Sequence, residues 1–176
     1  MRIVDESDID AVLDERIRDC LIECFPPDRE VFSRSRAWHG SAPAFSVVEE
    51  AGGRVLGQVG IVRRAVRAGG RELEVAGVQN VAVRAEARGA GLGPALLGAA
   101  MRHAAGAGIP FGLLFCVPGL GPYYGRQGWV VDAVPVTMEW EGRPGVPIPA
   151  KNICMILSLR GDPFPEGTIA ILGADW

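Results

Sequence analysis

The stretch Arg88-Gly89-Ala90-Gly91-Leu92-Gly93 separates the apolar run Val81-Ala82-Val83 from a helix-like segment that starts at Pro94. Where a strand passes through glycines into a helix, several backbone N–H groups and the positive end of the helix dipole point at one place. Glycine lets a bulky anion approach the backbone and accepts positive φ angles. The sequence therefore predicts a phosphate or pyrophosphate site at residues 88–93.

Three kinds of glycine loop bind phosphates, and the sequence distinguishes among them. A P-loop ends in Gly-Lys-Ser/Thr, but the chain's single lysine is Lys151. A dinucleotide fingerprint needs a third glycine where the chain has Pro94, and an acid about 20 residues further on, where Phe111-Gly-Leu-Leu-Phe-Cys116 stands. The pattern Arg/Gln-x-x-Gly-x-Gly/Ala remains and matches residues 88–93. An ordinary glycine-rich turn is the alternative on this loop alone.

A second motif, Tyr124-Gly-Arg-Gln-Gly128-Trp129, follows about 30 residues downstream. Together the two motifs resemble the GNAT (Gcn5-related N-acetyltransferase) superfamily, which combines this glycine loop with a Tyr-x-x-x-Gly-Phe/Trp sequence. The resemblance implies that the loop holds the pyrophosphate of acetyl-CoA. It also implies that Tyr124 protonates the leaving thiolate when an amine attacks the thioester, since a phenol near the sulfur can donate a proton. Tyr123 is the reserve candidate, and simple packing of Tyr124 is the alternative.

The resemblance assigns further residues to acetyl-CoA. The pantetheine amides are expected to pair with the open edge of the strand that contains Val81, Ala82 and Val83, which should splay from the strand at residues 111–116. Asn80 interrupts the apolar alternation of this strand, as a β-bulge beside a site often does; a solvated strand segment is the alternative. The expected pyrophosphate-binding residues are Arg88, Gly89, Ala90, Gly91, Leu92, Gly93 and Pro94.

Two subgroups of the superfamily are similar to particular segments of the chain. Residues 75–97, the Tyr124 motif and the tryptophan terminus resemble the aminoglycoside 2′-N-acetyltransferases, whereas residues 34–65, 109–112 and 165–169 resemble the rhizobial nodulation N-acyltransferases. Both subgroups acylate amino sugars, so the resemblance implies an amino sugar or an aminoglycoside-like antibiotic as the acceptor. The expected acceptor-binding residues are Gln79, Asn80, Asp175 and Trp176. A packed terminus without a part in binding is the alternative for the last two.

One departure from the aminoglycoside family concerns the general base. That family has a glutamate in the strand before the loop, and the matching position here is Gln79, which cannot take a proton. An amine is mostly protonated near pH 7, so it must lose a proton before it attacks. Glu74 and Glu139 are the expected bases, Glu141 and His39 are further candidates, and each of them is also explained as a solvated surface group.

Composition and charge narrow the classes of function. The 176 residues, 48% of them hydrophobic, are expected to form one GNAT domain over residues 1–176. A net charge of −3 without a basic patch argues against nucleic acid as the main partner. No stretch looks long and apolar enough to cross a membrane, and the N-terminal sequence is unlike a signal peptide, so a cytoplasmic location is expected.

The cysteines predict neither a disulfide framework nor a metal site. Cys20 and Cys24 are four residues apart in a helix-like segment, whereas Cys116 and Cys154 lie in apolar, strand-like runs. The two histidines add no spacing typical of zinc ligands. Buried, reduced thiols and no bound metal are expected.

The pattern of apolar residues gives an order of elements that fits the resemblance. It predicts an α/β protein with the GNAT fold, in which about four helices flank a mixed, mostly antiparallel sheet of about seven strands. Strands are expected at residues 2–4, 42–50, 54–67, 71–83, 111–116, 129–140 and 152–160, and helices at 8–24, 28–38, 91–107 and around Tyr123 and Tyr124. Residues 161–176 look irregular, but an apolar run within them is expected to dock on the rest of the protein.

The motifs together predict an N-acetyltransferase that moves the acetyl group of acetyl-CoA to a primary amine of a small molecule. One alternative is a longer-chain N-acyltransferase of the nodulation type that uses acyl-CoA or an acyl carrier protein. The carrier protein is the less favoured donor, because the nodulation enzymes do not clearly keep the Tyr124 motif. Another alternative is a non-catalytic acyl-CoA-binding module. Exposed apolar strands are compatible with a homodimer.

Overall fold

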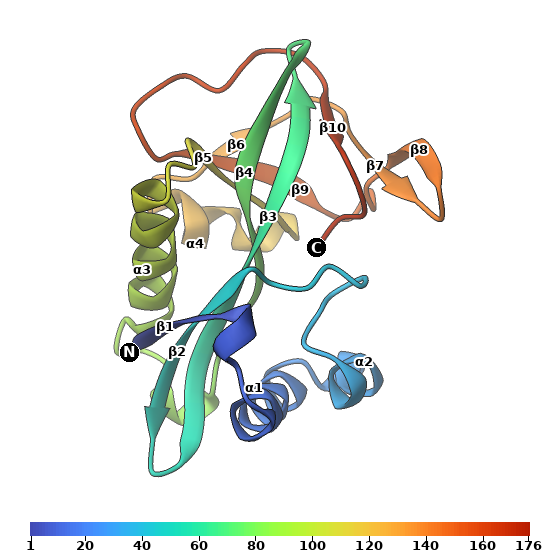
Figure 1. The fold of residues 1–176 in the computed structure, drawn as a ribbon. Helices are drawn as coiled ribbons and strands as arrows, with labels where there is room; N and C mark the ends of the chain where they lie inside the picture. Colours follow the sequence, from blue (N-terminus) through green and yellow to red (C-terminus); the bar gives the residue numbers. More distant parts are fainter. The chain divides into compact units, whose positions relative to one another are not determined.

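The computed structural model describes residues 1–176 as ten strands and four α-helices, joined in places by short 3-10 turns (Figure 1). The strands are β1 (Arg2–Asp5), β2 (Phe45–Ala51), β3 (Arg54–Ala68), β4 (Arg71–Val83), β5 (Phe111–Cys116), β6 (Val130–Asp132), β7 (Val136–Trp140), β8 (Arg143–Pro147), β9 (Ile153–Ser158) and β10 (Ile169–Ile171). The α-helices are α1 (Ala11–Cys24), α2 (Arg29–Arg34), α3 (Leu92–Gly106) and α4 (Gly121–Gly125).

All ten strands belong to one mixed sheet. Its order is β6-β9-β5-β4-β3-β10-β7-β8, and β2 also pairs with β3 and carries β1 on its other edge. The β4–β5 and β10–β7 pairs are parallel. The β1–β2, β2–β3, β3–β10, β5–β9, β6–β9 and β7–β8 pairs are antiparallel. The predicted class, a mixed and mostly antiparallel sheet with four helices, is confirmed.

The sheet has more strands than the sequence predicts because one expected strand is broken and two were missed. The strand expected at 129–140 is wrong as a single element, since β6 ends at Asp132 and β7 starts at Val136. The carboxylate of Asp132 accepts a hydrogen bond from the N–H of Val134 at 3.1 Å, and Pro135 has no N–H to donate to a ladder. The missed strands are β8 and β10. Because β10 pairs with both β3 and β7, the docking of the segment after residue 160 is confirmed.

The chain divides into two compact units. The first unit contains residues 1–62, 79–102 and 176, and the second contains residues 63–78 and 103–175. Accordingly β3, β4 and α3 each contribute residues to both units. That residues 1–176 act as a single domain stays a prediction.

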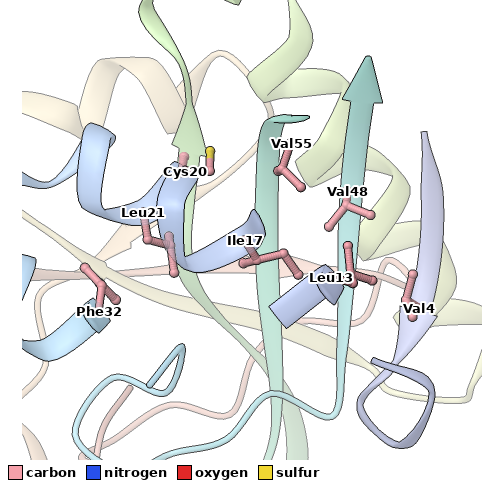
Figure 2. Close-up of a cluster of buried hydrophobic side chains, with 9 residues drawn as sticks. Val4, Leu13, Ile17, Cys20, Leu21, Phe32, Val48 and Val55 are labelled. Atoms are coloured by element: carbon pink, nitrogen blue, oxygen red, sulfur yellow. The ribbon is translucent and has the colours of Figure 1, made fainter. Parts of the chain in front are cut away.

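In the first unit, α1 packs against the sheet through one apolar face. Its buried residues Leu13, Ile17, Cys20 and Leu21 recur at helical spacing. Figure 2 shows these side chains beside those of the strands, and the cluster comprises Val4, Leu13, Ile17, Cys20, Leu21, Phe32, Val48, Val55 and Ala82. Each fully buried Leu or Ile side chain stabilises the fold by about 1.5–3 kcal/mol. The core therefore ties α1 and α2 to β1–β3 and to the end of β4.

The ends of the first two helices differ from the prediction. α1 starts at Ala11 rather than residue 8, because the carboxylate of Asp10 accepts a hydrogen bond from the N–H of Leu13 at 2.8 Å and caps the helix. The helix predicted from residue 28 begins at Arg29, and the side chain of Asp28, just before it, makes no capping hydrogen bond. α2 ends at Arg34, four residues before the predicted end, and the chain then turns back towards β2.

In the second unit, β5 lies between the first part of β4 and β9. The register of β4 with β5 runs from Val75 opposite Phe111 to Val78 opposite Leu114. β4 itself continues to Val83, and its residues from Gln79 onward belong to the first unit. All six residues of β5 pair with β9. β5 is thus a central strand, as its apolar sequence predicts.

Candidate active site

The predicted anion site lies where β4 leads into α3, through a 3-10 turn at Ala85–Ala87 (Figure 1). Gly89 and Gly91 have φ angles of 82° and 78°, a region that other residues rarely adopt. The first bond of the helix is donated by the N–H of Ala95 to the carbonyl of Gly91 at 3.1 Å. The N–H groups of Leu92 and Gly93, in the first helical turn, therefore have no partner four residues before them within the helix.

The glycines of this loop border open space. Gly89, Ala90 and Gly91 are exposed, and a Cβ added at Gly89 or Gly91 would meet no heavy atom within 4 Å. A ligand can therefore approach the backbone without contact with side chains. Exposed N–H groups at the positive end of a helix suit an anion, so this loop fits the pyrophosphate that the sequence analysis expects.

Arg88 turns back onto the protein instead of extending over the loop. Its Nε donates to the carbonyl of Val83 at 2.8 Å, and its guanidinium also forms a hydrogen bond with the thiol of Cys24. The pKa of Cys24 is lowered to about 7, chiefly by a hydrogen bond from Cys20 and to a smaller extent by Arg88. Arg88 thus braces the loop against the last turn of α1.

The end of β4 before the loop is irregular. Asn80 has a φ angle of 54°, and left-handed backbone in a strand is typical of the first residue of a G1 β-bulge. The side-chain amide of Gln58 donates to the Asn80 carbonyl, and the Asn80 side chain donates to the carbonyl of Arg36 at 2.9 Å. Val81 and Val83 are half-buried and Ala82 is buried. Polar contacts hold this irregularity, which accounts for the polar residue in an apolar run.

Gln79 is buried and bonded to the backbone of one turn. Its Oε1 accepts from the N–H of Trp38 at 3.0 Å, and its Nε2 donates to the carbonyl of Ser41 at 2.8 Å. The amide is thus bonded through both its donor and its acceptor. The sequence does not predict this role for Gln79, because the helix predicted over residues 28–38 leaves no turn at Trp38 for it to contact. The isolated polar pair Gln79-Asn80 in an apolar strand was the available signal.

In the second unit, Tyr124 lies in α4 and is buried, with 7% of its surface exposed. Burial, and then the neighbouring Cys116 and Tyr123, raises the pKa of its hydroxyl well above the usual range. The rings of Tyr123 and Trp129 make edge contacts with it, at centroid distances of 5.0 and 6.4 Å. Its carbonyl accepts from the N–H groups of Gln127 and Trp129, so the whole motif forms one compact turn.

The carboxylates expected as bases are on the surface of the second unit. Glu74 forms a two-point ion pair with Arg63, at 3.1 and 2.7 Å. Glu139 is exposed on β7, and its N–H donates to the carbonyl of Gly173 at 2.8 Å. Asp175 is only 4% exposed, and Trp176, in the first unit, is 5% exposed. Both expected acceptor residues of the tail are therefore packed.

The structure contains no group of three or more His, Cys, Asp or Glu side chains placed to hold a metal ion. All four cysteines are free thiols, and three of them are buried. None of the helices combines the length and apolar character needed to cross a membrane.

The fold and the loop define an α/β protein in which exposed main-chain N–H groups at the start of a helix suit an anion. The chain belongs to the GNAT acetyltransferase family, because the family model described as "Acetyltransferase (GNAT) domain" matches residues 1–131. The resemblance inferred from the two motifs is confirmed. So is the class of enzyme, an acyl-CoA-dependent N-acyltransferase.

Several solved structures share the fold. A GNAT family acetyltransferase from Brucella melitensis in complex with acetyl-CoA is 24% identical, with a TM-score of 0.62 over 96% of this chain and 94% of that chain. The GNAT family N-acetyltransferase YhbS from Escherichia coli, in complex with CoA, is 20% identical, with a TM-score of 0.67 over 96% of this chain and 87% of that chain. An aminoglycoside 6′-N-acetyltransferase complexed with coenzyme A is 13% identical, with a TM-score of 0.62 over 93% of this chain and 100% of that chain. No protein of curated function matches the sequence.

Proposed function

We propose that this GNAT protein transfers the acetyl group of acetyl-CoA to a primary amine of a small molecule, with amino sugars and aminoglycoside-like antibiotics as the favoured acceptors. The observation that carries the proposal is the exposed glycine loop between β4 and α3, with φ angles of 82° and 78° at Gly89 and Gly91. The family match and the acetyl-CoA and CoA complexes of proteins with the same fold support acetyl-CoA as the donor. The aminoglycoside 6′-N-acetyltransferase supports the choice of acceptor.

The cosubstrate is held mainly by backbone. The N–H groups of residues 89–93, at the start of α3, bind the pyrophosphate, whereas the N–H of Arg88 donates to the carbonyl of Ala85 at 3.2 Å. Pro94 leaves no N–H of its own to satisfy. The pantetheine amides pair with the edge of β4 at Val81, Ala82 and Val83. Support comes from the register of β4 with β5, which runs from Val75 to Val78 while β4 continues to Val83.

The reaction consists of one displacement at the thioester carbon. The acceptor ammonium gives up a proton, the amine nitrogen forms a bond to the carbonyl carbon, and the carbon–sulfur bond breaks. Tyr124 donates its hydroxyl proton to the leaving thiolate, and the second proton that the nitrogen loses as the amide forms restores the phenol through solvent. A phenol carries its proton at neutral pH, and burial raises the pKa of Tyr124 further, so the hydroxyl enters the reaction protonated.

The acceptor site includes Gln79 and Asn80 of β4, both in the first unit. The two amide residues contribute through the backbone segment that they hold, since the Gln79 side chain is bonded to Trp38 and Ser41.

A non-catalytic acyl-CoA-binding module is the second candidate, and Gln79 is the observation that favours it. An amide at the position of the family's glutamate takes no proton, and both ends of this amide are bonded to backbone. A module of this kind binds CoA through the same loop but acetylates no amine.

The test is thiol release from acetyl-CoA with a panel of amines that contains aminoglycosides, glucosamine oligomers, polyamines and amino acids. A rate that depends on one amine class, with an acetylated product seen by mass spectrometry, supports the enzyme and identifies the acceptor. Calorimetric binding of CoA without turnover for any amine, including with longer acyl-CoA donors, supports the module. Absence of CoA binding contradicts both.

A further inference from the structure

Residues 38–41 form a tight turn with a histidine at a conformationally restricted position. The N–H of Ser41 donates to the carbonyl of Trp38 at 2.8 Å, and the two residues between them, His39 and Gly40, have φ angles of 47° and 77°. Positive φ at both central residues is typical of a type I′ turn, which favours Asn-Gly or Gly-Gly. An asparagine would serve this turn better, so the turn alone does not account for the imidazole.

One buried side chain holds both ends of the turn. Gln79 accepts from the N–H of Trp38 and donates to the carbonyl of Ser41, so residues 39 and 40 are enclosed between two hydrogen bonds from the same amide. A glutamate at this position would accept from Trp38 but would repel the carbonyl oxygen of Ser41. The residue in the place of the family's glutamate thus positions His39.

The imidazole is also oriented by a fixed ring. The ring of His39 lies against the indole of Trp38, with centroids 5.1 Å apart, and this indole packs against the buried ring of Phe32 at 5.6 Å. His39 itself is an exposed residue. The imidazole therefore packs against Trp38 on one face and remains accessible to a small molecule from the solvent.

The turn lies beside the part of β4 where the acyl group is expected. In the proposed function, residues 88–93 hold pyrophosphate and β4 carries pantetheine from Val83 back to Val81. The thioester, which lies beyond the pantetheine, therefore falls at the Gln79–Asn80 end. Gln79 is the residue that contacts the turn directly, and the side chain of Asn80 donates to the carbonyl of Arg36, just before the turn.

We infer that His39 is the general base of the reaction and that Gln79 is its positioning residue. This inference rests on the proposed function. An imidazole nitrogen of His39 takes the proton from the acceptor ammonium, directly or through one water. The amine lone pair then forms the carbon–nitrogen bond, the carbon–sulfur bond breaks, and the thiolate receives the Tyr124 proton. The nitrogen loses its second proton as the amide forms, and that proton restores the Tyr124 phenol through solvent. Imidazole suits the first step because it is the side chain that titrates nearest to neutral pH.

The charged groups around the turn and two of the three rival carboxylates are engaged in ion pairs, and the third, Glu139, is exposed on β7 of the second unit. Arg36, which precedes the turn, is buried and pairs with Asp14 at 2.6 Å and with Glu6 at 2.7 Å. α2 presents Phe32 to the turn, and β4 presents the uncharged amides of Gln79 and Asn80. Among the carboxylates proposed as bases, Glu74 pairs with Arg63 and Glu141 with Arg143.

His39→Asn tests the inference, because asparagine accepts positive φ and lacks a basic nitrogen. Measured with the acceptor found in the amine panel, kcat should fall about 100-fold or more at neutral pH, while calorimetric binding of CoA stays unchanged. The acid limb of the pH profile of kcat/KM for the amine should move to higher pH, because without the base only amine that is already deprotonated in solution reacts. His103→Asn is the matched control, since His103 is the second histidine and is exposed on the last turn of α3, and it should keep the wild-type rate and profile.

His39→Gly is a second variant that keeps the turn, because glycine is compatible with positive φ. It should show the same fall in kcat, and added imidazole should restore part of the activity. A wild-type rate and pH profile in both variants would overturn the role of His39 while leaving acetyl transfer intact. Absence of turnover by the wild-type protein with every amine would instead overturn the proposed function, and this inference with it.

Discussion

Replacement of Gly91 by alanine separates the binding function of the glycine loop from its structural function. Gly91 has a φ angle of 78°, and a Cβ built on it meets no heavy atom within 4 Å. The substitution therefore lowers the free energy of unfolding only by the cost of an alanine in the left-handed region, about 1–2 kcal/mol. No clash within the protein adds to this cost.

The effect on the ligand is larger than the effect on folding. The new methyl group occupies the open space through which the pyrophosphate approaches the backbone. Loss of one hydrogen bond to a charged group costs about 1.5–3 kcal/mol. Because 1.4 kcal/mol corresponds to a factor of ten, the Kd for CoA should rise about 10- to 100-fold.

Gly53→Ala is a closely matched control. Gly53 lies in the turn between β2 and β3, with a φ angle of 76° and no heavy atom within 4 Å of an added Cβ. The conformational cost in the two variants is therefore the same, and both belong to the first unit. Urea titration should give equal losses of unfolding free energy, whereas calorimetry should show a weaker Kd for CoA in Gly91→Ala only.

An unchanged Kd for CoA in Gly91→Ala would refute the assignment of the loop as the pyrophosphate site. Equal weakening in both variants would refute it as well, since the loss would then follow from destabilisation rather than from a blocked backbone.

Four further predictions test other parts of the molecule. Tyr124→Phe should lower kcat about 100-fold and leave the Kd for CoA unchanged, because it removes only the hydroxyl; steady-state kinetics and calorimetry check this, and an unchanged kcat contradicts the acid role. Gln79→Glu should lower kcat, because a carboxylate cannot donate a hydrogen bond to the carbonyl of Ser41. A higher kcat would instead show that the new carboxylate acts as the base, and would contradict the role of Gln79 in positioning the turn at residues 38–41. Asp10→Ala should cost about 0.5–2 kcal/mol in urea titration, whereas Asp28→Ala, at a helix start without a capping bond, should cost less. Alkylation of Cys24 by iodoacetamide, followed by peptide mass spectrometry, should accelerate as pH rises through about 7 and level off above it, because the thiolate reacts and its pKa is about 7; a rate that keeps rising beyond pH 9 contradicts this.

The strands with strong apolar patterns and the glycine loop are readable from local sequence. β4 and β5 have the bounds that the sequence predicts, and α3 differs by one residue at each end. Glycine pairs mark the turns between β2, β3 and β4, because positive φ is needed there. The cosubstrate side of the proposed site can also be predicted from local sequence, because its strand, loop and helix follow one another in the chain.

The acceptor side of the proposed site depends on contacts between distant segments. The turn at residues 38–41 is defined by Gln79, about 40 residues later, and His39-Gly40 gives only a weak turn signal. The tail was expected to be irregular, but β10 forms because β3 and β7 offer it two free edges. Such long-range pairing leaves no periodic pattern in three residues. Tertiary contacts, rather than propensity, decide these elements.

Acetylation of an amine, followed by mass spectrometry, tests the central claim most directly. The wild-type protein is incubated with acetyl-CoA and the amine panel, and each amine is examined for the added acetyl group. Acetyl transfer to at least one amino-sugar amine, with an equivalent amount of CoA released, is the predicted result. Tight binding of acetyl-CoA without acetylation of any amine would contradict it and would make the protein an acyl-CoA-binding module.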